Sequence, residues 1–333
     1  MARSSWAAQV HRNEREAARR RKELVAYSRA QAVWQEHQRA QYEVNVFENQ
    51  IEFLNSMHKD CGETWDWRHL AVRQLPPPPS EGHAYEEAAR RVAADYAPSF
   101  LEKTFGGATK RRAQLQQSVE QARQQDVQLF QAAQAEHAGQ VEMSNWERAT
   151  AAGIIAGDLA AYHTVIEHLS PFAELVESGM TVSIDALQLD VAVVRCVVAD
   201  NSVVPSEEKK LTASGKLGTK KIAAGTYWSL YQDYVCGCAL RVVREMFALL
   251  PLPRIIVNVA ISGVDSSTGR HGQVIILTMS VPREVATGLR YATLDPSDSL
   301  KNFPHRIKFK KTSGFEAVEP MSVSEAFITS ATR

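Results

Sequence analysis

The feature that most constrains the fold is a stretch of fifty residues, 9–58, that contains neither glycine nor proline. Apolar side chains recur along its second half at alternating spacings of three and four. This spacing predicts a long helix that packs against another helix, either residues 109–169 or a second copy of the chain. We therefore expect self-association, or binding of a partner protein, through residues 30–58. The stripe is strongest at Val44, Phe47, Ile51 and Leu54.

Composition divides the remainder of the chain. Four consecutive prolines within residues 76–82 predict a stiff, extended linker. The segment before it, 1–75, is assigned to the coiled-coil helix and a corner, and the segment after it, 83–178, keeps helical periodicity. Residues 179–333 alternate between polar and β-branched side chains and carry strand signals. The expected fold class is α+β: a long amino-terminal helical region followed by a compact α+β domain.

The expected α+β domain has a mixed sheet and one central buried helix. That helix is predicted from the apolar run that follows Thr226, its predicted N-cap, and Pro251 lies just past its end. Cys236 and Cys238 fall inside this run, so we expect packed core thiols and not a metal or redox pair. Two short strands are predicted to turn near Ala186, and "PRIIVNVAIS" and "GQVIILTMSVP" are predicted to form a hairpin.

Charge and cysteine content restrict the function classes. The chain has 38 basic and 38 acidic residues, so a preference for nucleic acid must come from local patches. Neither a signal peptide nor a membrane-spanning run is recognisable, and the four cysteines form no spaced framework. We expect a cytoplasmic protein from a GC-rich bacterial source, with no membrane partner.

Lysines gather in two places. "SEEKKLTASGKLGTKK", residues 206–221, holds five lysines, and "KNFPHRIKFKK", residues 301–311, holds four together with two phenylalanines. The first stretch fails the phosphate-loop pattern because position 210 is not glycine and position 217 is neither Ser nor Thr. We expect 206–221 to be a mobile surface loop that helps to form a nucleic-acid-binding face. The predicted contact residues are Lys209, Lys210, Lys216, Lys220, Lys221, Lys308, Lys310 and Lys311.

A nuclease is the alternative interpretation. Asp190 opens an apolar run, and Glu207 and Lys209 follow after a gap; two carboxylates and a lysine in this order can hold Mg²⁺ and orient the attacking water. The order of elements around them resembles the restriction-endonuclease-like core. No other metal or cofactor is expected: His58, Cys61 and His69 lack the paired spacing of a zinc site and are interpreted as a packed corner.

Two functions therefore stay open. The first is a non-enzymatic, oligomeric assembly protein whose helices self-associate and whose α+β domain contacts a ligand, with nucleic acid as the expected class. The second is a Mg²⁺-dependent nuclease built on Asp190, Glu207 and Lys209. A role in phage defence fits either function.

Overall fold

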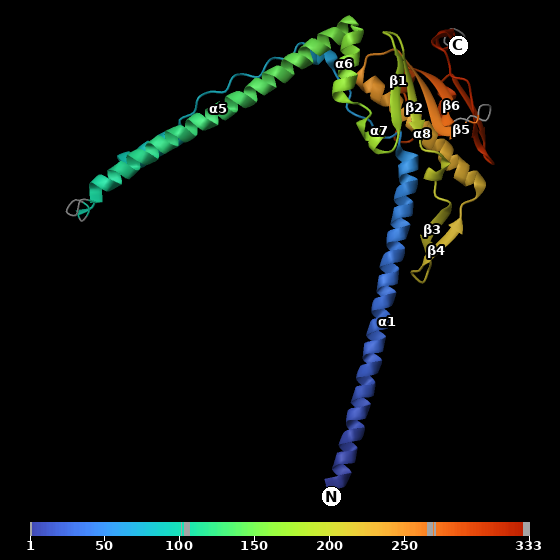
Figure 1. Ribbon diagram of the computed structural model, residues 1–333, viewed down its shortest axis with the longest axis horizontal. Helices are drawn as coiled ribbons and strands as arrows, with labels where there is room; N and C mark the ends of the chain where they lie inside the picture. Colours follow the sequence, from blue (N-terminus) through green and yellow to red (C-terminus); the bar gives the residue numbers. More distant parts are fainter. Residues whose placement is uncertain (1, 101, 103–106, 265–268, 270, 329–333) are drawn as a thin grey trace. The chain divides into compact units, whose positions relative to one another are not determined.

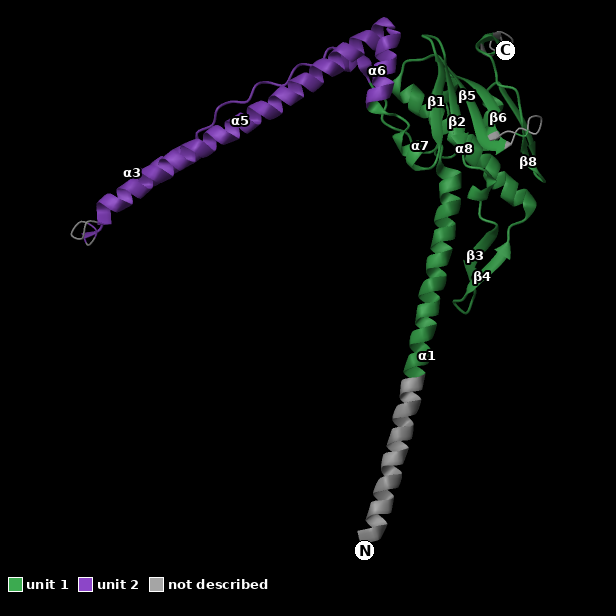
Figure 2. Cartoon of the chain, in the orientation of Figure 1, with its two compact units in different colours: residues 1–65, 169–333 green, residues 66–168 purple. Residues whose placement is uncertain are grey.

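The computed structural model describes residues 2–100, 102, 107–264, 269 and 271–328, without the side chains of residues 2–25, 264, 271, 326 and 328. The chain divides into two compact units, residues 1–65 with 169–333 (unit 1) and residues 66–168 (unit 2), shown in two colours in Figure 2. This division by contacts differs from the division by composition given above, and the predicted domain boundaries stay a prediction.

Unit 1 contains a mixed six-stranded sheet of order β1-β2-β5-β6-β7-β8 (Figure 1). β2 and β5 run parallel, and the other neighbouring pairs are antiparallel. The predicted α+β class with a mixed sheet is confirmed. The strands are β1 (Thr181–Leu187), β2 (Ala192–Val198), β5 (Arg254–Val264), β6 (His271–Pro282), β7 (His305–Lys310) and β8 (Gly314–Glu316).

One face of this sheet packs on helix α8 (Ala224–Leu249), which crosses from β2 to β5. From Tyr234 to Leu250 only Arg244 is not buried, so the predicted central buried helix is confirmed. Cys236 and Cys238 are fully buried in it, as predicted. The predicted N-cap was wrong: the helix starts earlier, after Ala223, and Thr226 lies in its first turn.

The opposite face is partly covered by the carboxy-terminal segment. Met321 packs with Val191 and Ile256 in a small buried cluster. The backbone N–H of Met321 donates to the Thr278 hydroxyl, and that of Val318 donates to the Ile275 carbonyl. Both faces of the central strands are thus covered, which agrees with their β-branched runs, although the face under the carboxy-terminal segment also holds the buried polar side chains of Asn258, Thr278 and Ser280.

Helix α1 (Ala2–Ser56) belongs to unit 1 and packs on α8 through its last turns. Val44 and Leu54 are buried, Phe47 and Ile51 are half-buried, and the Phe53 ring lies 6.2 Å from that of Tyr234 in α8. The predicted stripe is therefore buried, but the predicted partner was wrong for these residues. Within unit 1, α8 and the strands formed by residues 207–211 and 217–221 are the elements that α1 packs on.

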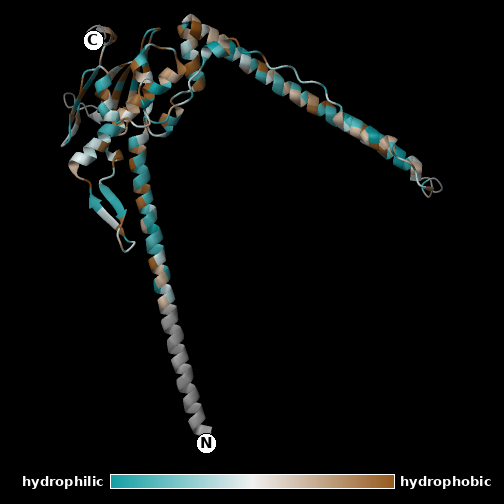
Figure 3. Cartoon of the chain, turned by 180° about the vertical axis from the view of Figure 1, so that it is seen from behind, coloured by the Kyte–Doolittle hydropathy of each residue, from teal (hydrophilic) through white to brown (hydrophobic). Residues whose placement is uncertain are grey.

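The lysine stretch 206–221 was predicted as a mobile loop, and this was wrong. It forms an antiparallel hairpin of β3 (Glu207–Leu211) and β4 (Leu217–Lys221). Glu207 pairs in register with Lys221, and Glu208 with Lys220, so opposite charges face each other across the strands. The hairpin is mainly hydrophilic (Figure 3), so its strands have no apolar periodicity from which they could be predicted.

Unit 2 is helical: α2 (Trp67–Ala71), α3 (Ala84–Ala94) and α5 (Gly107–Ala156), with most of α6 (Leu159–Leu169). Both α2 and α3 pack on α5. The buried Asp126 carboxylate accepts hydrogen bonds from the backbone N–H groups of Tyr85 and Glu86, so it stabilises the first turn of α3.

Short helices complete unit 1: α7 (Ala173–Glu177), α9 (Arg283–Thr287), α10 (Pro296–Ser299), α11 (Val323–Ile328) and the 3₁₀ turns η1 (Asn201–Val203) and η2 (Leu300–Asn302). Among the described residues, no helix combines the length and apolar character needed to cross a bilayer.

Candidate functional site

The hairpin β3–β4 lies against α1 and is held there by charge. The Lys209 ammonium is 2.6 Å from the Glu43 carboxylate, and Lys216 Nζ is 3.5 Å from a carboxylate oxygen of Glu36. Its lysine partner holds the pKa of Glu43 below the usual value. Next to the hairpin, the Gln50 amide donates a 2.7 Å hydrogen bond to the Val203 carbonyl.

The turn of the hairpin approaches α1 closely at Gly215. Its φ of +75° is in the left-handed region, and a Cβ there would lie 2.6 Å from Cδ2 of His37. Glycine is therefore required both by the backbone conformation and by the contact. The hairpin thus follows α1 only as far as residues 36–37, and α1 extends beyond the hairpin tip (Figure 1).

The predicted contact lysines do not form one free basic face. Lys209, Lys216 and Lys310 pair with Glu43, Glu36 and Glu316. Lys220 and Lys221 lie across from glutamates of β3, and Lys308 lies across from Glu316. Lys210 and Lys311 are exposed on the hairpin and after β7. Much of the basic charge predicted for a ligand is therefore balanced inside the fold.

The amino-terminal end of α8 nevertheless brings the two lysine groups toward each other. β4 ends at Lys221, two residues before the N-cap Ala223, and no side chain caps this helix. On the other side the β7–β8 turn packs on the same end of α8: a Cβ on Gly314 would lie 2.3 Å from the Trp228 ring. The N–H groups of the first turn carry a partial positive charge, and both lysines and glutamates adjoin this end of the helix.

A groove of about 600 Å³ lies between α1, the hairpin and the start of α8. Its floor is apolar, and its rim carries charges of both signs. The residues that line it include Phe47, Ile51, Ile222 and Leu230 in the floor and Glu48, Glu52, Glu208, Lys220 and Lys221 at the rim.

The residues of the predicted nuclease site lie on different sheets. Asp190 is exposed in the turn between β1 and β2, which spans residues 188–191 and not Ala186 as predicted. Glu207 and Lys209 are on β3 of the separate hairpin, and Lys209 is paired with Glu43. In the part of the chain that the structure describes, no three His, Cys, Asp or Glu side chains are grouped to hold a metal ion. These placements give the nuclease hypothesis no support, and it stays a prediction.

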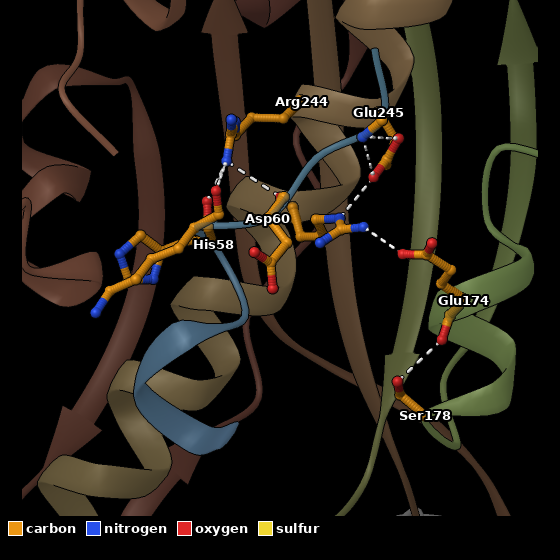
Figure 4. Close-up of polar contacts among 9 residues, drawn as sticks. His58, Asp60, Glu174, Ser178, Arg244 and Glu245 are labelled. Carbon is orange, nitrogen blue, oxygen red and sulfur yellow. Dashed lines mark hydrogen bonds and ion pairs between the residues drawn. The ribbon is translucent and has the colours of Figure 1, made fainter. Parts of the chain in front are cut away.

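Sequence reasoning missed a polar joint at the end of α1. Arg244 of α8 donates from Nη1 to the carbonyl oxygens of His58, Lys59 and Asp60 at 2.6, 2.7 and 3.1 Å. Figure 4 shows this guanidinium turned toward the end of the α1 segment. Its other face stacks on the Tyr291 ring, 4.3 Å from the centroid. Arg244 thereby satisfies carbonyls that the helix end leaves open.

An ion network with a buried centre and one exposed carboxylate, that of Glu174, adjoins this joint. Arg241 donates to the carboxylates of Glu245 at 2.6 Å and Glu174 at 2.8 Å, and the Gly62 N–H donates to Glu245 (Figure 4 shows both carboxylates). Arg241 and Glu245 are each 6% exposed. The signal in the sequence was present: three of the four charged residues of α8, at positions 241, 244 and 245, interrupt its apolar second half, and buried charges need partners.

Of the three residues in the rejected zinc pattern, His58 and Cys61 lie near this network, and His69 does not. His58 is 1% exposed, and its ring lies close to backbone groups of Leu294 and Tyr291. Burial lowers its pKa. Cys61 is half-buried and lines a cavity of about 580 Å³ with Arg241 and Glu245; burial and the Glu245 charge raise its pKa. His69 lies in unit 2, in α2.

A long exposed stretch of unit 1 lies on α1. Every side chain from residue 26 to residue 39 is exposed. Tyr27, Val33 and Trp34 are 69%, 63% and 62% exposed. Comparison with known proteins adds no relative, since no family model, curated protein or solved structure matches the chain.

Proposed function

We propose that the protein is a non-enzymatic assembly protein in which unit 1 holds one half of α1 and presents the other half to a second copy of the chain. The observation that carries the proposal is the exposure of Tyr27, Val33 and Trp34 on a helix whose later turns are docked. Exposed aromatic side chains of this size are enriched in protein interfaces and unusual in a solvated helix.

The second half of α1, residues 40–56, packs on unit 1 and is called the docked half. It supports the same function. Buried side chains, the hairpin ion pairs and the Arg244 hydrogen bonds all act on residues 36–60, so this part of α1 is held against the rest of unit 1. Long helices without tertiary contacts gain most of their stability from packing an exposed face on a partner. Association would supply that packing for the first half of α1.

The experiment is the mass of the purified protein in solution, measured by size-exclusion chromatography with light scattering over a range of concentrations. The wild-type protein is expected to associate, and Tyr27→Asp combined with Trp34→Asp is expected to return it to a monomer. The matched control is Ala32→Asp, which adds a charge to the opposite side of the same exposed segment. A monomeric wild-type protein at every concentration would contradict the proposal.

A second candidate function concerns an anionic ligand, with nucleic acid as the proposed class. It is favoured by the uncapped start of α8, which lies beside Lys220 and Lys221 and under the β7–β8 turn. Binding to DNA or RNA should weaken with salt, and Lys308→Gln with Lys311→Gln should flatten that dependence. Lys301→Gln is the control, because Lys301 is paired with Asp298 at 2.7 Å. No salt-dependent binding at low ionic strength would rule this candidate out. A cytoplasmic location and a role in phage defence are part of the same proposal.

A further inference from the structure

Helix α1 carries opposite net charges on its two halves. In the sequence, residues 2–29 hold eight arginines or lysines and three glutamates, a net charge of 8 − 3 = +5. Residues 30–56 hold one arginine and four glutamates, a net charge of 1 − 4 = −3. Both halves belong to one continuous helix. A helix with this asymmetry attracts a second copy in the opposite direction and repels it in the same direction.

The exposed aromatic residues lie near the border between the two halves. Tyr27 and Trp34 are seven residues apart and so share one side of the helix, with the small Ala30 between them. This side differs from the docked stripe, because Val44 and Leu54 point to α8 and the hairpin from another side.

We infer that two copies pair through α1 in antiparallel orientation, about a two-fold axis near Ala30. This inference rests on the proposed self-association and specifies its geometry. In this register Tyr27 of each copy faces Trp34 of the other, and Ala30 lets the two backbones approach at the axis. The macrodipoles of the two helices then oppose each other, which is also favourable.

The same register places glutamates of one copy near arginines of the other copy. Glu36 and Glu43 are already engaged by hairpin lysines, whereas Glu48 and Glu52 are exposed and have no ion pair within the described residues. Across the axis, residues 9–15 of the second copy, a segment that contains Arg12 and Arg15, lie opposite residues 46–52, a segment that contains Glu48 and Glu52. A parallel pair would instead place the two +5 halves side by side.

Disulfide trapping tests the orientation. The background variant is Cys61→Ser, because the other three native cysteines are buried. Ala30→Cys is expected to cross-link two copies under mild oxidation. Gln41→Cys alone should give no cross-link, but mixed with Arg20→Cys it should cross-link, since a disulfide needs Cα atoms within about 7 Å.

The outcomes separate this inference from the proposed function. Efficient cross-linking of Gln41→Cys with itself would show parallel pairing and overturn the inference while leaving self-association intact. A dimeric mass with no cross-link at any of these positions would place the interface elsewhere and would also overturn it. A monomeric mass would overturn the proposed function and the inference together.

Charge reversal gives an independent test that leaves the aromatic contact in place. Glu48→Arg with Glu52→Arg should weaken association by about two- to fivefold for each pair lost. Adding Arg12→Glu and Arg15→Glu to the same chain should restore it. If Arg12→Glu and Arg15→Glu do not restore association while the helical content is unchanged, the antiparallel register is contradicted.

Discussion

The two halves of α1 share a helix but differ in what supports them. Residues 40–56 carry buried side chains, and the segment that follows is fixed by Arg244 and by the packing of His58 against Gly237. Residues 26–39 are exposed, and Glu36 and His37 at their end touch the hairpin turn. The later half is therefore part of the unit 1 core, and the earlier half is the exposed surface that we propose to bind a second copy.

The largest expected difference between the halves is in stability. Leu54→Ala should lower the free energy of unfolding of unit 1 by about 2–5 kcal/mol, because Leu54 is fully buried and its loss leaves a cavity. Val33→Ala, its counterpart in the exposed half, should change it by no more than about 0.5 kcal/mol. Chemical denaturation of the monomer measures both, and similar effects for the two substitutions would contradict the comparison.

The joint at the end of α1 is expected to contribute less. Arg244→Ala leaves three carbonyl oxygens without their donor and should destabilise unit 1 by about 1.5–3 kcal/mol. The control is Arg29→Ala in the exposed half, for which no loss is expected. A thermal melt of both variants is sufficient, and an Arg244→Ala variant as stable as the control would show that the joint does not anchor α1.

His58 should make the docked half sensitive to pH. Burial, and then the Lys59 charge, lower its pKa below 6.5, while backbone groups of Leu294 and Tyr291 act in the opposite direction. The unfolded chain thus binds a proton more readily than the folded one. Stability from the neutral ring is present above about pH 6.5 and is lost as the pH falls from there toward the folded-state pKa. His58→Gln should flatten this decline in denaturation measurements between neutral and mildly acidic pH; an unchanged slope would exclude His58 as its source.

The hairpin ion pair is expected to have the smallest effect. Lys209 and Glu43 are each about one-third exposed, so a double-mutant cycle with Lys209→Gln and Glu43→Gln should give a coupling of about 0.2–1 kcal/mol. High salt should reduce this coupling further. A coupling that is large and independent of salt would mean that the hairpin, and not α8, holds the docked half.

The sequence predicted the parts of the fold that have periodic apolar patterns. The helix α1, the central helix with Cys236 and Cys238 and the strands β5 and β6 all follow from such patterns. The hairpin β3–β4 did not, because its strands pair charges across the register and have almost no apolar face. The partner of the α1 stripe could not be read from one sequence, since periodicity identifies a buried face and not the surface that covers it.

The candidate site was less predictable for a related reason. Lysines 209 and 216 look like a free basic patch in the sequence, but the fold places them beside Glu43 and Glu36, which are far away along the chain. Asp190 and Glu207 look like a spaced pair, but they belong to different sheets. Local spacing cannot report on contacts between distant segments.

Hydrogen exchange along α1 tests the central claim most directly. At low concentration, amides in residues 44–56 should be as protected as those of α8, while amides in residues 26–36 should exchange rapidly. At high concentration the earlier segment should become protected and the later one should not change. Equal protection of both segments at low concentration, or no dependence on concentration in the earlier one, would contradict the account of a docked half and a partner-binding half.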